Sequence, residues 1–170
     1  KKHAEGTLSY TTSPVHNNEY FLEMAKKLES MGSDTLAIKD MAGLLTPQST
    51  KELVSLLTKN ISIPIHVHSH ATAGLASLNL IAAVEAGATI IDTCNSSFSE
   101  GASHPTTESI IAALQSMGYE INIDIAAIDS ISEHLREARK KYWQFESEFT
   151  GVDPRVLSNQ VPGGMISNLS

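Results

Sequence analysis

The sequence has 170 residues, of which 41% are hydrophobic and 18% are charged, a composition that fits one compact globular domain. Its net charge of -7, without a basic run, argues against nucleic acid as a partner. No apolar run reaches the roughly 18 residues of a membrane span, and the N-terminus does not resemble a signal peptide. We expect a cytoplasmic protein, because a single cysteine fits a reducing compartment. The single cysteine, Cys94, cannot form an internal disulfide, and we interpret it as a small buried side chain.

Short strand candidates alternate with amphipathic helices along the first 118 residues. We predict strands at residues 6–12, 34–39, within 63–74 and at 89–93. The helices are expected at residues 18–31, 47–59 and 75–86, followed by one that Gly118 ends. Four βα units in succession indicate an α/β fold with a parallel sheet. The polar and glycine-rich segments follow the strands, where active sites of such folds lie.

The pattern changes after Gly118. Residues 121–146 begin like a strand and continue as a long helix through Ile128, Ile131 and Leu135. The rest is irregular and contains Pro-Gly-Gly-Met at residues 162–165. We therefore divide the chain into four βα units, residues 1–118, and a helical extension, residues 119–170.

The third strand carries three histidines at a spacing of two: His66, His68 and His70. Alternate side chains of a strand point to the same face, so the three imidazoles are expected on one side, roughly 7 Å apart. Two of them can close on one divalent ion, because imidazole is a common ligand of zinc and related metals. The alternative is that these polar residues only mark an exposed strand face.

Lys39 ends the strand that precedes the histidine strand. Sequential parallel strands are usually neighbours, so Lys39 can face His68 and His70. A protonated lysine cannot bind a metal, but a neutral amine reacts with carbon dioxide to give a carbamate with carboxylate-like oxygens. The alternative is a solvated lysine paired with Asp40.

Three motifs resemble those of the biotin-dependent carboxyltransferases: Lys-Asp-Met-Ala-Gly at residues 39–43, His-Ser-His-Ala-Thr-Ala-Gly at 68–74, and the Pro-Gly-Gly-Met run. The resemblance is to the α subunit of oxaloacetate decarboxylase and, more distantly, to the carboxyltransferase domain of pyruvate carboxylase and the central subunit of transcarboxylase. It covers residues 6–169. It implies the C-terminal half of a (β/α)8 TIM barrel of the HMG-CoA lyase-like superfamily, plus the start of the helical region that follows.

The same resemblance implies a site for a divalent metal (Zn, Mn or Co). Its ligands fall on carbamylated Lys39, His68 and His70, while His66 is left as a structural or supporting residue. Thr72 and Gly74 also match the family. The family's Arg-Asp-x-x-Gln motif, which supplies an aspartate ligand, has no counterpart here, so we expect the N-terminal half of the barrel to be absent from this chain. Biotin is expected on a separate carrier domain, because no Met-Lys-Met sequence occurs.

The loop after the fourth strand departs from the family. Residues 102–105 read Ala-Ser-His-Pro, with Ala102 where the family has a threonine that is proposed to carry the proton between biotin and pyruvate. We take Ser103 as the candidate catalytic residue that replaces this threonine. Thr106 is a second candidate for this role, but it is equally well interpreted as the N-cap of the helix that begins at Thr107.

The implied function is metal-dependent carboxyl transfer between oxaloacetate or pyruvate and biotin, as in an oxaloacetate decarboxylase α subunit. A cation at the keto oxygen stabilises the enolate that remains when the carboxyl group leaves. The resemblance also implies a homo-oligomer and membrane-bound pump subunits as partners. Two alternatives stay open: an acyl-CoA lyase or synthase of the same superfamily, and an inactive half-barrel that needs a complementary chain.

Overall fold

A computed structural model describes residues 2–146 and 151–159. Its sheet contains four strands: β1 (Glu5–Ser9), β2 (Thr35–Asp40), β3 (Ile65–Ser69) and β4 (Ile90–Ile91). All neighbouring pairs are parallel, and the strand order β1-β2-β3-β4 follows the chain. The predicted α/β class and the pairing of sequential strands are therefore confirmed.

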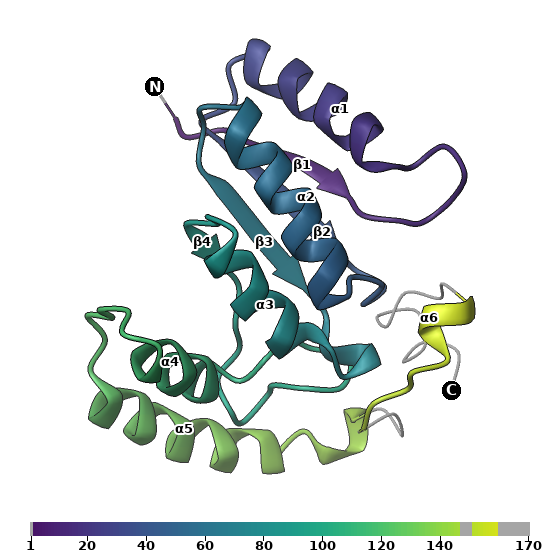
Figure 1. The fold of residues 1–170 in the computed structure, drawn as a ribbon. Coiled ribbons are helices and arrows are strands. Elements are labelled where there is room, and N and C mark those ends of the chain that lie inside the picture. Colours follow the sequence, from purple (N-terminus) through teal and green to yellow (C-terminus); the bar gives the residue numbers. More distant parts are fainter. Residues whose placement is uncertain (1, 147–150, 160–170) are drawn as a thin grey trace.

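A helix follows each strand: α1 (Asn18–Ser30), α2 (Pro47–Asn60), α3 (Ala76–Glu85) and α4 (Thr107–Ser116). A short 3-10 turn, η1 (Ala71–Ala73), lies between β3 and α3. Figure 1 shows α1, α2 and α3 packed along one face of the sheet, while α4 lies beyond the end of that layer. This arrangement is that of consecutive βα units in a partial barrel.

Local sequence signals fix where the helices begin. The Asn17 side chain accepts a hydrogen bond from the Tyr20 amide at the start of α1. Thr46 and Ser49 form a reciprocal capping box at the start of α2, and Pro47 occupies the first turn. The predicted helix starts are thus correct to within a residue or two.

The two faces of the sheet differ in polarity. Gly6 and Leu8 of β1 are buried, as are Ile65 and Val67 of β3. The side chains of Leu8, Ile65 and Val67 lie on the face that the helices cover. This face forms the core with apolar residues of the covering helices, among them Phe21, Ala25, Leu53, Val54, Leu57, Leu80 and Ile110. The alternate residues, including Glu5 and His68, lie on the opposite face, which is the inner face of a barrel.

Three local expectations need correction. β4 contains only two residues, because the chain beyond it bends so that Cys94 pairs with Thr106 in an isolated bridge. Cys94 is half-buried rather than buried. Leu78, an apolar residue of the amphipathic helix expected at residues 75–86, is 57% exposed, while Asn79 and Leu80 of α3 are buried.

The predicted strand near residue 121 is also wrong, since residues 119–124 form neither strand nor helix. Asp124 caps α5 (Ile125–Lys140), which lies beside α4 in Figure 1. Two short elements complete the described chain, η2 (Trp143–Phe145) and α6 (Val156–Asn159). The Pro-Gly-Gly-Met motif at 162–165 lies outside the described residues. Among the helices that the structure describes, none has the length and apolarity to cross a membrane.

Candidate metal and carboxyl-transfer site

The ends of β2 and β3 bring the two predicted groups together. Lys39 and His68 are register partners in the parallel ladder, and the His70 amide donates to the Asp40 carbonyl at 3.0 Å. Lys39, His66 and His68 line one cavity of about 190 Å³ on the inner face of the sheet. The structure thus places Lys39 beside the histidine strand, as its position in the sequence predicts.

Asp40 fixes the loop between Lys39 and α2. Its buried carboxylate accepts hydrogen bonds from the amides of Leu44 and Leu45, at 2.8 and 2.9 Å, and from the Ser69 hydroxyl at 3.1 Å. Burial raises the pKa of Asp40, and these three donors oppose that shift by favouring the ionised form. The carboxylate therefore ties the loop to the end of β3 and is not free to pair with Lys39.

Gly43 lets this loop approach the histidine segment. Its φ of +70° is in the left-handed region, and a Cβ there would lie 3.2 Å from the His70 carbonyl oxygen and 3.3 Å from the Ala73 amide nitrogen. Only a residue without a side chain allows both the turn and the close approach. The glycine of Lys-Asp-Met-Ala-Gly thus has a physical role in placing His70.

Three histidines converge above the inner face: His68, His70 and His104. One ligand nitrogen of each ring lies within 4.8 Å of those of the other two. The ring centroids of His104 are 4.3 Å from His68 and 4.5 Å from His70, and those of His68 and His70 are 5.3 Å apart. A group of this kind is suited to a divalent metal ion.

Oxygen acceptors fix the orientation of each ring. Nδ1 of His68 lies 2.6 Å from the Asp92 carboxylate, Nδ1 of His70 lies 2.7 Å from the Ala102 carbonyl oxygen, and Nδ1 of His104 lies 3.0 Å from the Ser69 carbonyl oxygen. A carbonyl oxygen only accepts, so Nδ1 must be the protonated nitrogen of His70 and His104. An ionised Asp92 imposes the same tautomer on His68. Nε2 is then the nitrogen with a free lone pair in all three rings.

Burial also favours the neutral form of two of these rings. It lowers the pKa of His70 and of His104, against the opposing effect of their backbone acceptors. The neighbouring imidazoles lower both pKa values further, since charges on adjacent rings repel. Neutral imidazole is the form that binds metals.

His66 lies among carboxylates, apart from the three converging histidines. Its Nδ1 is 3.0 Å from Glu5 Oε2, and its Nε2 is 3.0 Å from Asp92 Oδ1. Burial alone would lower the pKa of His66, but the two carboxylates outweigh it and raise that pKa. Burial alone would raise the pKa of Asp92, but the hydrogen bonds from His68 and His66 hold it below its usual value. His66 therefore supports Asp92, which in turn orients His68.

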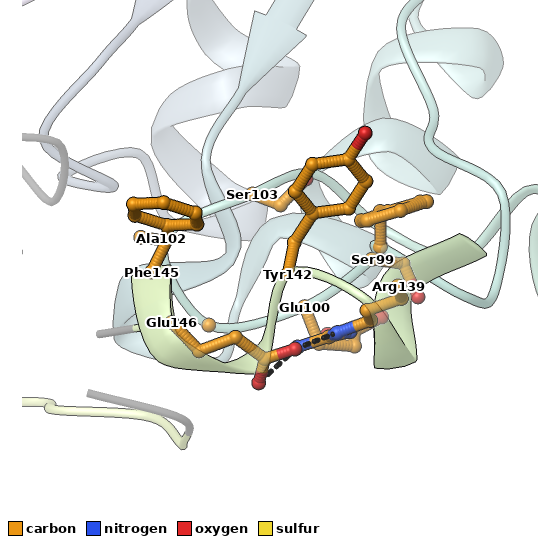
Figure 2. A pocket seen from close by; sticks show the side chains of 10 residues that line it. Ser99, Glu100, Ala102, Ser103, Arg139, Tyr142, Phe145 and Glu146 are labelled. Carbon is orange, nitrogen blue, oxygen red and sulfur yellow. Dashed lines mark hydrogen bonds and ion pairs between the residues drawn. The ribbon is translucent and has the colours of Figure 1, made fainter. Parts of the chain in front are cut away.

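Ser103 lines a second cavity, of about 330 Å³. Figure 2 shows this cavity between the 99–103 loop and the end of α5, with the rings of Tyr142 and Phe145 beside the ion pair of Arg139 and Glu146. The Ser103 carbonyl accepts the Ala71 amide at 2.8 Å, which joins this loop to the segment after His70. Ser103 is thus close to the site along the chain but opens into a different cavity from Lys39.

Thr106 occupies the N-cap position of α4, as expected, but its hydroxyl does not cap the helix. It bonds instead to Ser99 and Glu100 within the loop.

His104 was not predicted to lie beside His68 and His70. The residue lies 34 positions beyond His70 and outside the strand pattern that identified the other two. Its signal was a histidine in the polar loop after the next strand, because loops at the carboxyl ends of parallel strands meet at one edge of the sheet.

Comparisons with known proteins agree with this geometry. A sequence model of the HMGL-like family matches residues 4–135. The chain is 48% identical to a pyruvate carboxylase subunit of Methanocaldococcus jannaschii over 166 residues, covering 97% of this chain and 29% of that protein. It is 41% identical to the methylmalonyl-CoA carboxyltransferase 5S subunit of Propionibacterium freudenreichii subsp. shermanii over 170 residues, covering 99% of this chain and 34% of that protein.

The same relationship holds in three dimensions. The carboxyl transferase domain of Rhizobium etli pyruvate carboxylase, solved with pyruvate and biocytin, superposes with a TM-score of 0.95 at 35% identity, covering 99% of this chain and 29% of that one. The chain thus spans about a third or less of the length of these relatives. From its sequence match and its partial-barrel fold, the chain belongs to the HMGL-like family.

Proposed function

We propose that this chain supplies the metal-binding part of an active site that transfers a carboxyl group between biotin and a 2-oxo acid, either oxaloacetate or pyruvate. The observation that carries the proposal is the convergence of three oriented imidazoles next to Lys39 at the carboxyl ends of β2 and β3. Support comes from the relatives, whose names include pyruvate carboxylase and a carboxyltransferase, and from the Rhizobium etli domain with pyruvate and biocytin.

The side chains fit a divalent metal. Each converging imidazole has its Nδ1 hydrogen-bonded to an oxygen, the usual arrangement of a metal-binding histidine, and keeps Nε2 free. In our proposal His68, His70 and carbamylated Lys39 hold the metal. A divalent metal held there supplies Lewis-acid stabilisation of the negative charge that develops on a 2-oxo acid during carboxyl transfer.

Lys39 is placed to complete this set once it is carbamylated. Its ammonium first loses a proton, the neutral amine attacks carbon dioxide, and the nitrogen then releases a second proton. The product would be an anionic carbamate, which offers oxygen ligands beside His68. The carbamate also lowers the positive charge of the site. Activity is then expected to depend on dissolved carbon dioxide.

Carboxyl transfer between oxaloacetate and biotin needs no further reactant. In the decarboxylation direction the bond between C3 and the C4 carboxyl of oxaloacetate breaks, and its electron pair remains on the enolate of pyruvate. The carboxyl group forms a bond to a ureido nitrogen of biotin, and the proton displaced from that nitrogen ends on the enolate carbon. The chain must position both substrates and carry this proton, for which Ser103 is the proposed group.

Among such enzymes, we propose that the chain is part of an oxaloacetate decarboxylase α subunit, because its motifs resemble those of that subunit. Biotin would arrive on a carrier domain, and the barrel would be completed by four further βα units that supply the aspartate ligand. Residues 119–170 would begin the helical region behind the barrel. A homo-oligomer, membrane-bound pump subunits and a cytoplasmic location stay predictions of the same resemblance.

The test uses the full-length protein that contains these residues, comparing Lys39→Ala with the wild type. We expect Lys39→Ala to abolish both metal retention after dialysis and biotin-dependent oxaloacetate decarboxylation. Lys51→Ala is the matched control, because Lys51 is exposed on α2. Metal retention in Lys39→Ala, together with turnover of an acyl-CoA substrate, would instead favour the lyase alternative.

A further inference from the structure

We propose that a hollow beside the end of α5 binds a mononucleotide, a ligand that combines a phosphate group with a planar base. The hollow has a volume of about 470 Å³ and lies between residues 96–97, in the loop after β4, and side chains of residues 136–146. The described residues that line it are separate from Lys39, the three converging histidines and Ser103. The inference therefore does not rest on the proposed function.

The hollow is positively charged although the chain as a whole is acidic. Three of the side chains that line it are cationic, Arg136, Arg139 and Lys140, and one is anionic, Glu146. The net charge of the 170 residues is -7, so this local excess of positive charge runs against the overall composition. The hollow therefore favours an anionic ligand.

Arg136 has donors available for such a ligand. A guanidinium group carries five N–H donors, and within the described chain Arg136 uses one of them, on the Ser96 hydroxyl at 3.2 Å. Arg136 and Lys140 are both exposed and stand one turn apart on α5, so they can contact a ligand from the same side. A guanidinium fork and an ammonium group together suit the several oxygens of a phosphate group.

The neighbouring carboxylates do not cancel this charge. Both oxygens of Glu146 accept hydrogen bonds from Arg139, at 2.6 and 3.2 Å, and Figure 2 shows this pair beside the neighbouring cavity. Glu137 pairs with Lys140, but both side chains are 70% exposed, and ion pairs of this kind are weak. Arg139 and Glu146 therefore form a neutral wall, while Arg136 and Lys140 supply the charge that attracts the phosphate.

Trp143 offers a face for a planar ring. It is the single tryptophan of the sequence, and its side chain lines the hollow while being 73% exposed. Tryptophan is highly buried on average, so an indole this exposed beside a cationic hollow indicates a ligand that covers it. Bases of nucleotides stack on such rings whatever their identity. The structure therefore indicates a nucleotide without selecting its base.

Hydrogen bonds to the buried Ser132 hold the walls of the hollow in place. The Asn95 side-chain amide donates to Ser132 Oγ at 2.7 Å, and the Ser97 hydroxyl donates to the Ser132 carbonyl at 2.8 Å. Arg139 adds a hydrogen bond from its guanidinium group to the Ser97 carbonyl. Walls that are already ordered lower the entropic cost of binding, and the volume is within the usual range for small-molecule sites.

Calorimetric titration of the full-length protein with AMP tests the site. We expect saturable binding of one AMP per chain that weakens as salt is added, because salt screens exposed charges. Adenosine lacks the phosphate and inorganic phosphate lacks the base, so each should bind about tenfold more weakly than AMP, or less tightly still. A protein that does not bind AMP saturably, or that binds adenosine or inorganic phosphate as tightly as AMP, overturns the proposal.

Variants assign the binding to this hollow. Arg136→Gln and Lys140→Gln should each weaken AMP binding by about tenfold, the usual effect of losing a hydrogen bond to a charged group. Lys51→Gln is the matched control, because it removes a positive charge from an exposed position on α2, and it should bind AMP as the wild type does. Wild-type affinity in both α5 variants, or an equal loss in Lys51→Gln, would place the nucleotide elsewhere and overturn the proposal.

Tryptophan fluorescence gives a second readout that needs no loss of affinity. AMP should quench the part of the emission that Trp143→Phe removes, and Trp143→Ala should weaken AMP binding by about tenfold through the lost stacking. Unchanged Trp143 emission at saturating AMP overturns the proposal. Circular dichroism establishes that each variant is folded, and the titrations of the wild-type protein remain decisive for any variant that is not.

Discussion

The Asp92 carboxylate holds the His68 imidazole through a 2.6 Å hydrogen bond to Nδ1. Asp92 follows β4 and His68 lies in β3, so the contact joins neighbouring strands at their carboxyl ends. A carboxylate in this position fixes the tautomer and raises the basicity of Nε2, the nitrogen that faces a metal. Asp92 is thus a positioning residue for the proposed metal site, and it was not identified from the sequence.

Asp92→Asn should weaken metal binding by about 10–100-fold, because an amide oxygen can still accept from His68 but carries no charge. Equilibrium dialysis with Zn²⁺ on the full-length protein measures the change. Asp129→Asn, at an exposed position of α5, is the matched control and should bind as the wild type does. An unchanged affinity in Asp92→Asn would show that His68 needs no carboxylate partner.

A second prediction concerns Gly43, whose missing side chain allows the close approach to His70. Gly43→Ala should lower the free energy of unfolding by more than the roughly 1–2 kcal/mol that a left-handed conformation costs an L-residue, because its Cβ would also meet the His70 carbonyl. Chemical denaturation measures the loss. Displacement of His70 should weaken metal binding at the same time.

Gly118→Ala is a matched control for this variant. Gly118 also has a positive φ, of +91°, but a Cβ there meets nothing within 4 Å. It should therefore show the conformational cost alone, with unchanged metal affinity. Equal losses of stability in the two variants would mean that the His70 contact adds nothing.

Much of this fold could be predicted, because each βα unit carries its own signals. Thr46 and Pro47 predict the start of α2, and the alternation of Leu8 with polar residues predicts β1. Lys39 and His68 could be placed together because sequential parallel strands pair. These inferences depend on short-range patterns and one topological rule.

Contacts between loops could not be predicted in the same way. His104 and Asp92 reach the site through bends after β4, where hydrogen bonds to Ser69 and His68 set their direction. No periodicity encodes such bends. The short β4 has a related cause, because Cys94 beyond it pairs with Thr106 of the following loop.

A third prediction uses the pH dependence of the contacts between His66 and its two carboxylates. The lowered pKa values of Glu5 and Asp92 mean that their contribution to stability is complete above the unfolded values, 4.5 and 3.8, and is lost as the pH falls through the folded ones. The raised pKa of His66 means that its contribution is complete below 6.5 and is lost as the pH rises through the folded value. Together they stabilise most between pH 4.5 and 6.5.

His66→Gln should therefore lower the melting temperature most in that window and less on either side. The corresponding loss in the free energy of unfolding should be at most about 1 kcal/mol. Asp92 and Glu5 are partly exposed, so solvent screens their ion pairs with His66. Thermal unfolding of the full-length protein with a chelator, from pH 3 to pH 9, excludes the contribution of the metal. A difference between His66→Gln and wild type that does not vary with pH would contradict the assignment, and His134→Gln, at an exposed position of α5, gives the baseline.

The last prediction concerns the proton that moves during carboxyl transfer. Ala102 stands where the related carboxyltransferases are expected to have a threonine, and Ser103 offers the neighbouring hydroxyl in the cavity of Figure 2. If Ser103 carries the proton, Ser103→Ala should lower kcat for oxaloacetate decarboxylation by about 10²–10⁴-fold, the usual contribution of acid–base catalysis. Metal affinity should stay unchanged, because Ser103 contacts the histidine segment only through its backbone.

Ala102→Thr provides the complementary test, since it places a hydroxyl at the threonine position. In the Ser103→Ala background it should restore part of kcat, whereas Ser130→Ala, at an exposed position of α5, should leave kcat unchanged. Deuterium exchange into pyruvate, followed by NMR, reports the proton step directly. Full exchange in Ser103→Ala would exclude Ser103 as the carrier, and the proton would then reach the enolate through another residue or a water molecule.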